Sequence, residues 1–253
     1  MRRVLRIIES GLKPARWNVA MTAALAELHA TARISDTLRF HRYPACVLIG
    51  RSQDAGLAAD LGYCRREGIE IARRVTGGGA VFMTPETLAW DVIVDRGATG
   101  SLEDITRQIG EGVAAGLSQL GVVARFRPPN DIEIDGRKVS GTSGYASGRS
   151  ALLQGTVLVT DIACAMASAL RLSETMLRGK ITSLAEAGAA LPSPPHLMAC
   201  LTSALTAKLH YAPVFASPST EEVALCENLL RDELGTDAFV RESTGAAVWL
   251  ANC

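Results

Sequence analysis

Alternating apolar and polar residues predict several short strands along the chain. Residues 4–9, VLRIIE, alternate well enough for an opening strand. Residues 87–96 alternate more fully and would place four apolar side chains on one face of a strand: Leu88, Trp90, Val92 and Val94. Other strands are predicted at residues 37–40 and 45–50 around a turn at Pro44, in IEIARRV and AVFM on either side of three glycines, and in VVARF, DIEIDGRKVSG and ALLQGTVLV.

Helices are predicted where this alternation stops. Residues 17–32 are rich in alanine and contain neither Gly nor Pro. A second helix is predicted to begin at Ser101, with Asp104 three residues on, and to end near Gly121. After about residue 160, helices are predicted in DIACAMASALRLS, HLMACLTSALTAKLH and TEEVALCENLLRDEL, the last capped by Ser219 or Thr220, with a loop at residues 187–195. The fold class that follows is α+β: a mostly antiparallel or mixed sheet flanked by helices, with a helical C-terminal part.

Composition narrows the classes of protein to which the chain can belong. Its 253 residues are enough for one large domain, and 48% hydrophobic residues allow a sizeable core. Lys and Arg number 26, as do Asp and Glu, so the zero net charge indicates no nucleic-acid partner and no membrane surface. No apolar run of about 18 residues predicts a membrane span, and Arg6 and Glu9 interrupt the first apolar run too early for a signal peptide.

The cysteines and histidines suggest no metal centre. Six cysteines are scattered along the chain with no C-x-x-C pair, which argues against a disulfide framework and a structural zinc site. The four histidines show no metal-ligand spacing. We therefore expect a protein of the reducing cytoplasm.

The stretch RRVTGGGAVF is the first candidate for chemistry. Its three glycines, residues 77–79, permit positive φ and let a ligand approach the backbone, whose N–H groups can form an anion-binding concavity. Arg73 and Arg74 precede them, and neighbours in a strand point to opposite faces, so at most one would face a given pocket. The spacing matches neither a Rossmann nor a Walker loop, and a flexible hairpin remains an alternative.

The stretch NDIEIDGRKVSGTSGY is the second candidate. Asn130 and Asp131 precede a strand, and such a pair can coordinate Mg²⁺ or order phosphates. The chain then turns at Asp135-Gly136, a type I′ hairpin pair, and returns through Lys138 among small residues. Lys138 could face a cleft, or it could be an ordinary solvated strand residue.

Together these two stretches resemble the lipoate-protein ligase A family, within the biotin/lipoyl protein ligase superfamily. The motifs R-R-x-[ST]-G-G-G-A-V and N-D-x-x-x-x-G-x-K-x-S-G occur here in that order. Upstream, DTLRFHRYPACVLIGRSQD resembles the family's strand before G-[RK]-x-Q, and downstream LRGKITSLAE resembles the segment after the acyl-pocket strands. The resemblance implies a ligase-like catalytic domain at residues 1–190, with a helical extension packed on it at residues 191–253 and no large accessory C-terminal domain.

The resemblance also implies a chemistry. Lipoate or octanoate reacts with Mg-ATP to give an acyl-adenylate, and the acyl group then passes to a lysine of a carrier domain. The implied catalytic residue is Lys138, which stabilises developing charge. The implied lipoate and adenylate contacts are Arg73, Arg74, Gly77, Gly78, Gly79, Lys138, Ser140, Gly141 and Thr142; those to ATP are Arg74, Gly79, Ala80, Val81, Phe82, Asn130 and Asp131, with Asp131 as the implied Mg²⁺ ligand. The strand LLQGTVLV would wall the acyl tunnel.

Some positions depart from the family's pattern. Many members read A-V-[FY]-H-D after the glycines, where this chain has Met83 and Thr84, and another polar pair is replaced by Leu153 and Gln154. Without an accessory domain, such a ligase would need a separate accessory protein or an unusual carrier.

Two alternatives to the ligase remain open. Acyl transferases of the same superfamily move octanoyl or lipoyl groups between carriers through a cysteine thioester. The stretch GVVARFRPPNDIEIDGRK contains no cysteine, and Cys46 and Cys164, in a predicted strand and helix, are more typical of inert core residues. A non-catalytic lipoyl or adenylate binder is the other alternative, but Lys138 and the arginine pair favour an enzyme.

Overall fold

The computed structural model describes residues 3–241 and contains two β-sheets. The large sheet has the strand order β11-β1-β2-β6-β10-β9-β8-β7. Its strands are β1 (Arg3–Leu12), β2 (Thr37–Arg42), β6 (Leu88–Asp95), β7 (Ala124–Arg127), β8 (Asp131–Ile134), β9 (Arg137–Ser147), β10 (Ser150–Val157) and β11 (Tyr211–Ala216). The small sheet has the order β4-β3-β5, formed by β3 (Cys46–Ile49), β4 (Glu70–Arg73) and β5 (Val81–Met83).

Strand pairing makes the large sheet mixed. β1 pairs in parallel with β2 and with β11, whereas the strands from β2 through β6, β10, β9 and β8 to β7 pair antiparallel. The β8–β9 hairpin turns at Asp135 and Gly136, whose φ angles of 50° and 75° are those that a type I′ turn requires. The α+β class and the mixed sheet flanked by helices are thus confirmed.

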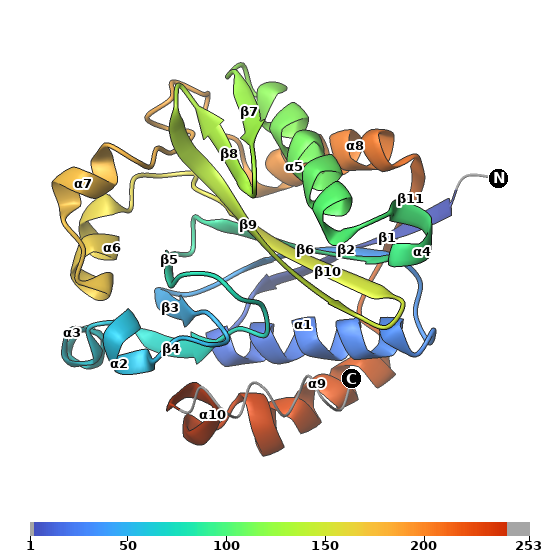
Figure 1. Ribbon diagram of the computed structural model, residues 1–253, viewed down its shortest axis with the longest axis horizontal. Helices are drawn as coiled ribbons and strands as arrows, with labels where there is room; N and C mark the ends of the chain where they lie inside the picture. The colour runs from blue at the N-terminus through green and yellow to red at the C-terminus, as the bar shows by residue number, and fades with distance from the viewer. Residues whose placement is uncertain (1–2, 242–253) are drawn as a thin grey trace.

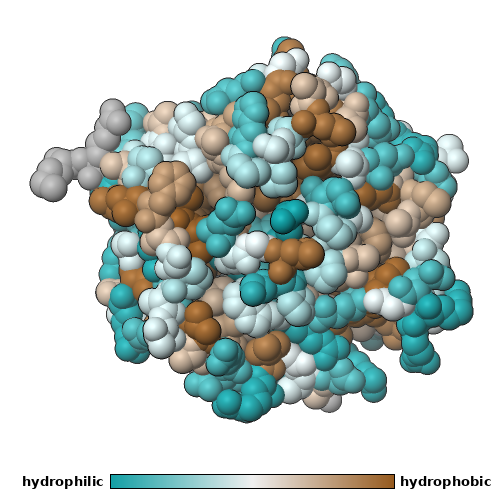
Figure 2. Space-filling model, turned by 180° about the vertical axis from the view of Figure 1, so that it is seen from behind, coloured by the Kyte–Doolittle hydropathy of each residue, from teal (hydrophilic) through white to brown (hydrophobic). Residues whose placement is uncertain are grey.

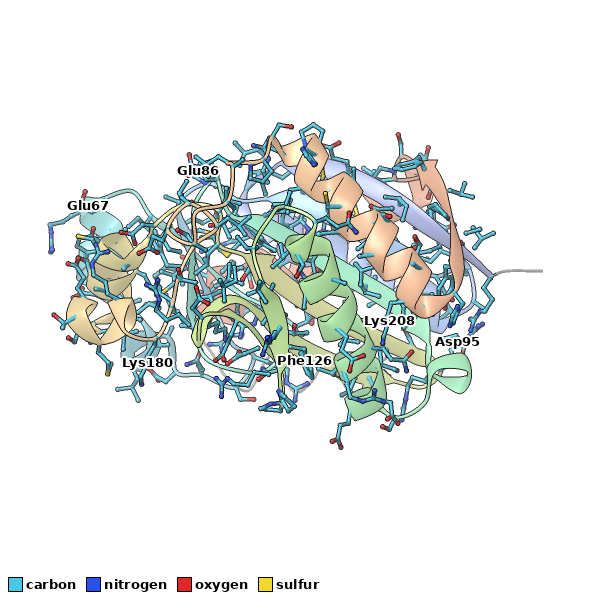
Figure 3. All side chains as sticks on the ribbon, turned by 90° about the horizontal axis from the view of Figure 1, so that it is seen from above. Glu67, Glu86, Asp95, Phe126, Lys180 and Lys208 are labelled. Atoms are coloured by element: carbon cyan, nitrogen blue, oxygen red, sulfur yellow. The ribbon has the colours of Figure 1, made fainter. Side chains whose placement is uncertain are left out.

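Helices cover both faces of the large sheet (Figure 1). On one face lie α5 (Leu102–Ser118) and α8 (Pro194–Leu209), which run side by side in Figure 3. On the other lies α1 (Ala15–Ala30), itself covered by α9 (Thr220–Leu229). The remaining helices are short: α2 (Ala55–Ala58), α3 (Leu61–Arg66), α4 (Arg96–Thr99), α6 (Ala163–Leu170), α7 (Glu174–Arg178), the π-helix η1 (Leu230–Leu234) and α10 (Asp237–Arg241).

Local capping explains where two of the helices begin. Ser101 caps α5 and forms a capping box with Asp104, as the sequence predicted, although α5 ends at Ser118 rather than at Gly121. Ser219, rather than Thr220, caps α9 through the N–H of Glu222. No helix within residues 3–241 is both long and apolar enough to cross a bilayer.

The C-terminal part differs from the helical expectation in one element. β11, which the sequence patterns did not predict, pairs with β1 at the edge of the large sheet. Its segment, YAPVFA, contains Pro213 and shows no two-residue alternation of burial, both typical of an edge strand. The predicted boundary between a catalytic domain and a C-terminal extension at residue 190 stays a prediction. The last residues of that extension, 242–253, lie outside the described part of the chain.

Two apolar cores lie on opposite faces of the large sheet. The face toward α5 and α8 buries residues such as Phe40, Trp90 and Val92, and the face toward α1 buries Ala89 and Ile93. Trp90 fits because its partner on β10 is Gly155, where a Cβ would lie 2.0 Å from the indole ring. On the face of the molecule shown in Figure 2, apolar residues occur in small groups separated by hydrophilic ones.

Candidate active site

A cavity of about 290 Å³ lies between the large sheet and the small sheet. The large sheet contributes residues of β2, β6, β9 and β10, and the small sheet contributes Leu48, Val81 and Phe82. The glycine stretch borders the same cavity, and apolar side chains from α6 and α7 complete it, among them Met166 and Leu177. Both stretches that the sequence singled out therefore meet at one site.

Arg74 organises the glycine loop. Its guanidinium donates hydrogen bonds to the carbonyls of Gly77 (2.7 Å) and Gly79 (2.8 Å), and to that of Leu48 (2.9 Å). Burial lowers the pKa of Arg74 to about 10, which still leaves it charged at neutral pH. Among the described residues, the N–H groups of residues 77–79 donate no hydrogen bond. Gly78 and Gly79, which line the cavity, thus carry unpaired backbone donors, the basis of an anion site.

The loop is also fixed from two other sides. Ser143 on β9 donates to the Gly77 carbonyl at 2.7 Å. Gly50, at the end of β3, lies so close that a Cβ there would be 1.9 Å from the Gly78 oxygen. Gly78 itself has a φ of 93°, which favours glycine. The predicted flexible hairpin is therefore a constrained loop.

Arg73, for which the resemblance implied a contact with lipoate and adenylate, does not line the cavity. The side chain is fully buried and donates to the carbonyls of Gly50, Arg51 and Gln53 on one side and of Phe239 and Val240 on the other. These five carbonyls hold the guanidinium away from the cavity, and Arg73 does not belong to the cavity lining. The alternation rule allowed only one of the two arginines to face the pocket, and Arg74 is that one.

Lys138 lies at the cavity mouth. Its side chain is 39% exposed, and its ammonium is 2.6 Å from Asp131 Oδ1. A Cβ on Gly141 would lie 2.5 Å from Lys138 Nζ, so the absence of a side chain there lets the lysine take this position beside the strand. Asn130 also lines the cavity, and its side-chain amide donates to the Thr142 carbonyl at 2.6 Å.

Asp131, the Mg²⁺ ligand implied by the resemblance, lies beside Lys138 at the cavity mouth. Its second oxygen pairs with Arg127 at 2.9 Å, so two cations already neutralise it. No group of three His, Cys, Asp or Glu residues within the described chain could hold a metal ion. The residues present therefore fit only an Mg²⁺ that arrives on nucleotide phosphates, with Asp131 as one further ligand.

Most of the predicted site residues line the cavity. They are Arg74, Gly78, Gly79, Ala80, Val81, Phe82, Asn130, Lys138, Ser140, Gly141 and Thr142. Arg73, Gly77 and Asp131 do not belong to its lining. Met83, where relatives often carry histidine, is buried in the core beneath α1, and Thr84 lies 3.3 Å from the hydroxyl of Thr87; neither lines the cavity.

A row of polar side chains that the sequence patterns did not predict crosses the large sheet. Arg39, Asp91, Gln154 and Ser143 are direct partners on β2, β6, β10 and β9, and we call them the polar row. Arg39 pairs with Asp91 (3.1 Å), and Gln154 donates to the other Asp91 oxygen (3.0 Å) and accepts from Thr76 (2.9 Å). The row therefore holds the glycine loop by two hydrogen bonds, one between Gln154 and Thr76 and one between Ser143 and Gly77. Asp91, flanked by apolar residues in the strand predicted at residues 87–96, was the available sequence indication.

No cysteine among residues 3–241 lines the cavity. Cys46 is fully buried on β3, and burial raises the pKa of its thiol well above the ordinary value. Cys164 is exposed on α6, and Cys64, Cys200 and Cys226 are buried elsewhere. Cys253 lies outside the described residues.

Solved structures of known proteins share this fold. A structure titled as a bi-partite lipoate protein ligase and its E2 lipoyl domain, from Thermoplasma acidophilum, superposes with a TM-score of 0.82 at 23% identity, covering 95% of this chain and 96% of that one. A lipoate-protein ligase A bound with ATP superposes with a TM-score of 0.82 at 22% identity, covering 97% and 100%. The fold is therefore that of the lipoate-protein ligases.

Sequence relatives include two kinds of enzyme. A probable lipoate-protein ligase A of Mycoplasma pneumoniae is 29% identical over 53% of this chain, a match that spans only 39% of that relative. The octanoyltransferase LipM of Symbiobacterium thermophilum is 28% identical over 72% of this chain and 78% of its own length. The model of the lipoyl protein ligase A/B catalytic domain matches residues 14–205. The chain belongs to this family.

Proposed function

We propose that the protein is an ATP-dependent lipoate-protein ligase. A carboxylate oxygen of lipoate or octanoate attacks the α-phosphorus of ATP, which forms the acyl-adenylate and releases pyrophosphate. The amine of a carrier-domain lysine then attacks the acyl carbonyl, which forms an amide and releases AMP. The observation that carries the proposal is the meeting of the loop's unpaired N–H groups and the Lys138 ammonium at one cavity.

Each of these groups has a task in the first step. The N–H groups of the glycine loop donate to phosphate oxygens, and Arg74 holds the loop in the shape that presents them. Lys138 has to leave Asp131 to reach the acid's carboxylate and the phosphate that becomes part of the adenylate. Its charge stabilises the negative charge that develops as pyrophosphate departs. Asp131, once released, is free to meet a cation on the nucleotide.

Relatives support this choice of ligands. Solved structures of similar fold are titled as bound with ATP and as bound with lipoic acid, and one is titled together with its E2 lipoyl domain. We therefore propose lipoate or octanoate and Mg-ATP as substrates and a lipoyl carrier domain as the acceptor.

A carrier-to-carrier acyltransferase is the second candidate, since octanoyltransferases are among the sequence relatives. That reaction needs a thiolate close to the acyl group. Within residues 3–241 the cavity lacks a cysteine, and the Cys46 thiol is stabilised in its protonated form. This observation favours the ligase.

One set of assays separates the candidates. The purified chain is incubated with lipoate, Mg-ATP and an apo carrier domain, and pyrophosphate and carrier mass are followed; a carrier with its acceptor lysine replaced by arginine is the control. Pyrophosphate release together with a lipoylated carrier supports the ligase. Acylation that occurs only from an octanoyl-carrier donor, without ATP, contradicts it in favour of the transferase. Ligand binding without turnover from either donor contradicts both enzymes and supports a binder.

A further inference from the structure

The turn after β3 has the sequence GRSQ, residues 50–53, and the proposed reaction gives it no task. We call it the support turn. Its backbone contacts the glycine loop at two points. Arg51 N–H donates to the Thr76 carbonyl at 3.0 Å, and Gly50 packs directly against the Gly78 carbonyl. The position of the glycine loop therefore depends on the position of the support turn.

Arg73 binds the support turn with one end of its guanidinium. Its Nη1 donates to the carbonyls of Gly50 (3.1 Å), Arg51 (2.8 Å) and Gln53 (2.7 Å). The side chain is fully buried, and the hydrogen-bond partners that it has are carbonyl oxygens. A buried donor that loses its acceptor is costly, so the cation and the turn hold each other in place.

The other end of the same guanidinium binds α10. Nε donates to the Phe239 carbonyl at 2.9 Å, and Nη2 donates to the Val240 carbonyl at 2.7 Å. Carbonyls in the last turn of a helix have no partner within the helix and carry partial negative charge, so a cation is favourable there. One planar group thus joins α10 to the support turn.

α10 has contacts of its own that keep it in place beside the small sheet (Figure 1). Phe239 is 5% exposed and packs in the core that contains α1. Val240 is equally buried and packs in the core between the small sheet and α6. Arg16 on α1 pairs with Asp237 at 2.8 Å. α10 therefore presents its carbonyls to Arg73 at fixed positions.

We propose that α10 is a positioning element for the glycine loop, and that Arg73 is the positioning residue through which it acts. The contacts run from α10 through Arg73 to the support turn, and from there to the loop. No residue of α10 lines the cavity, yet its displacement lowers the affinity for nucleotide phosphates and leaves the binding of lipoate unchanged. The inference rests on the proposed ligase function, because it takes ATP as the anion on the loop.

The first test loosens α10 without altering Arg73 or the cavity. Phe239→Ala removes a buried contact of α10, and Leu201→Ala, fully buried on α8 in the other core, is the control for a general loss of stability. Pyrophosphate release by the full-length protein gives kcat and the KM for ATP and for lipoate. We expect Phe239→Ala to raise the KM for ATP about fivefold, the effect of one weakened hydrogen bond, with kcat and the KM for lipoate nearly unchanged. Leu201→Ala should change neither KM.

The second test alters the link itself. Arg73→Lys keeps the positive charge, but a single ammonium cannot reach carbonyls on both sides as the guanidinium does. We expect a similar rise in the KM for ATP. Adding Phe239→Ala to Arg73→Lys should raise it no further, because both changes break one chain of contacts. A rise of about 25-fold in the double variant, the product of two independent effects, would contradict transmission through Arg73.

Hydrogen exchange follows the link without any enzyme activity. The Arg51 amide, bonded to the Thr76 carbonyl, should exchange about tenfold faster in Phe239→Ala than in the unaltered protein, and Leu201→Ala should leave its rate unchanged. Absence of pyrophosphate with every acid overturns the ligase proposal alone, and the exchange rates then decide the inference. An unchanged rate in folded Phe239→Ala overturns it. So does an unchanged KM for ATP in active Phe239→Ala, or an equal rise in Leu201→Ala.

Discussion

The two faces of the large sheet differ in chemistry although the same strands make both. On β6, Trp90, Val92 and Val94 face α5 and α8 and bury apolar surface, whereas Asp91, between them, faces α1 and joins the polar row. The apolar face fixes strand register, because a slip by one residue would expose its side chains. That register in turn brings the members of the polar row into line. Both faces bury apolar surface, but only the face toward α1 also carries the polar row that holds the glycine loop.

Breaking the buried ion pair should have the largest effect. Arg39→Met leaves the Asp91 carboxylate buried without its cation, and we expect a loss of about 3–5 kcal/mol in the free energy of unfolding. Urea denaturation measures it. Arg42→Met, a half-buried neighbour on the same strand, should change stability by less than about 0.5 kcal/mol. A cost for Arg39→Met no larger than that of the control would show that the polar row is not structural.

Removing the cavity cation should affect chemistry without affecting stability. Lys138→Ala is expected to slow adenylate formation by about 10²–10³-fold, the effect of losing one preorganised donor in a transition state. Pyrophosphate release measures the rate, and circular dichroism should show an intact fold. Lys180→Ala is the control, because this neighbouring lysine, labelled in Figure 3, is exposed and does not line the cavity. Near-normal release by folded Lys138→Ala would remove Lys138 from the mechanism.

Adding a methyl group to the tightly packed apolar face should instead lower the stability of the fold. Gly155→Ala puts a methyl group 2.0 Å from the Trp90 ring, and the expected cost is about 1–3 kcal/mol in the free energy of unfolding. Gly179→Ala, where the closest atom would be 3.6 Å away, should be tolerated. Denaturant midpoints compare the two variants. If both variants have the same midpoint, the packing of Trp90 on Gly155 does not limit the sheet.

The smallest expected effect lies where the polar row meets the loop. Ser143→Ala removes the hydrogen bond to the Gly77 carbonyl, worth about 1 kcal/mol. We expect the KM for ATP to rise about fivefold with kcat nearly unchanged, since the loop is loosened rather than removed. Ser147→Ala, further along β9 and outside the cavity lining, serves as the matched control. An unchanged KM in Ser143→Ala would mean that the loop's other contacts hold it without Ser143.

Local features of the fold could be predicted from the sequence, and long-range pairing could not. Ser101 with Asp104 and Asp135 with Gly136 determine a helix start and a turn through atoms a few residues apart. β11 escaped prediction because its strand character comes from pairing with β1, some 200 residues earlier in the chain.

The candidate site likewise contains some residues that the sequence could predict and others that it could not. Motif residues such as Lys138 and Arg74 could be assigned to the cavity in advance, since the two quoted stretches carry them. The polar row could not, because Arg39, Asp91, Gln154 and Ser143 lie in four separate segments and meet only through register. Alternation allowed only one of Arg73 and Arg74 to face the pocket, but only the neighbouring carbonyls show which.

The bonds of Arg73 have a consequence for the order of events during synthesis. Its guanidinium joins the turn after β3 to the carbonyls of Phe239 and Val240, which the ribosome adds 166 and 167 residues later. Until those residues emerge, a buried cation next to the glycine loop lacks two of its acceptors. The loop's support is therefore completed only after residues 239 and 240 have been made, and a nascent chain that already contains Lys138 still lacks part of the framework on which the site depends.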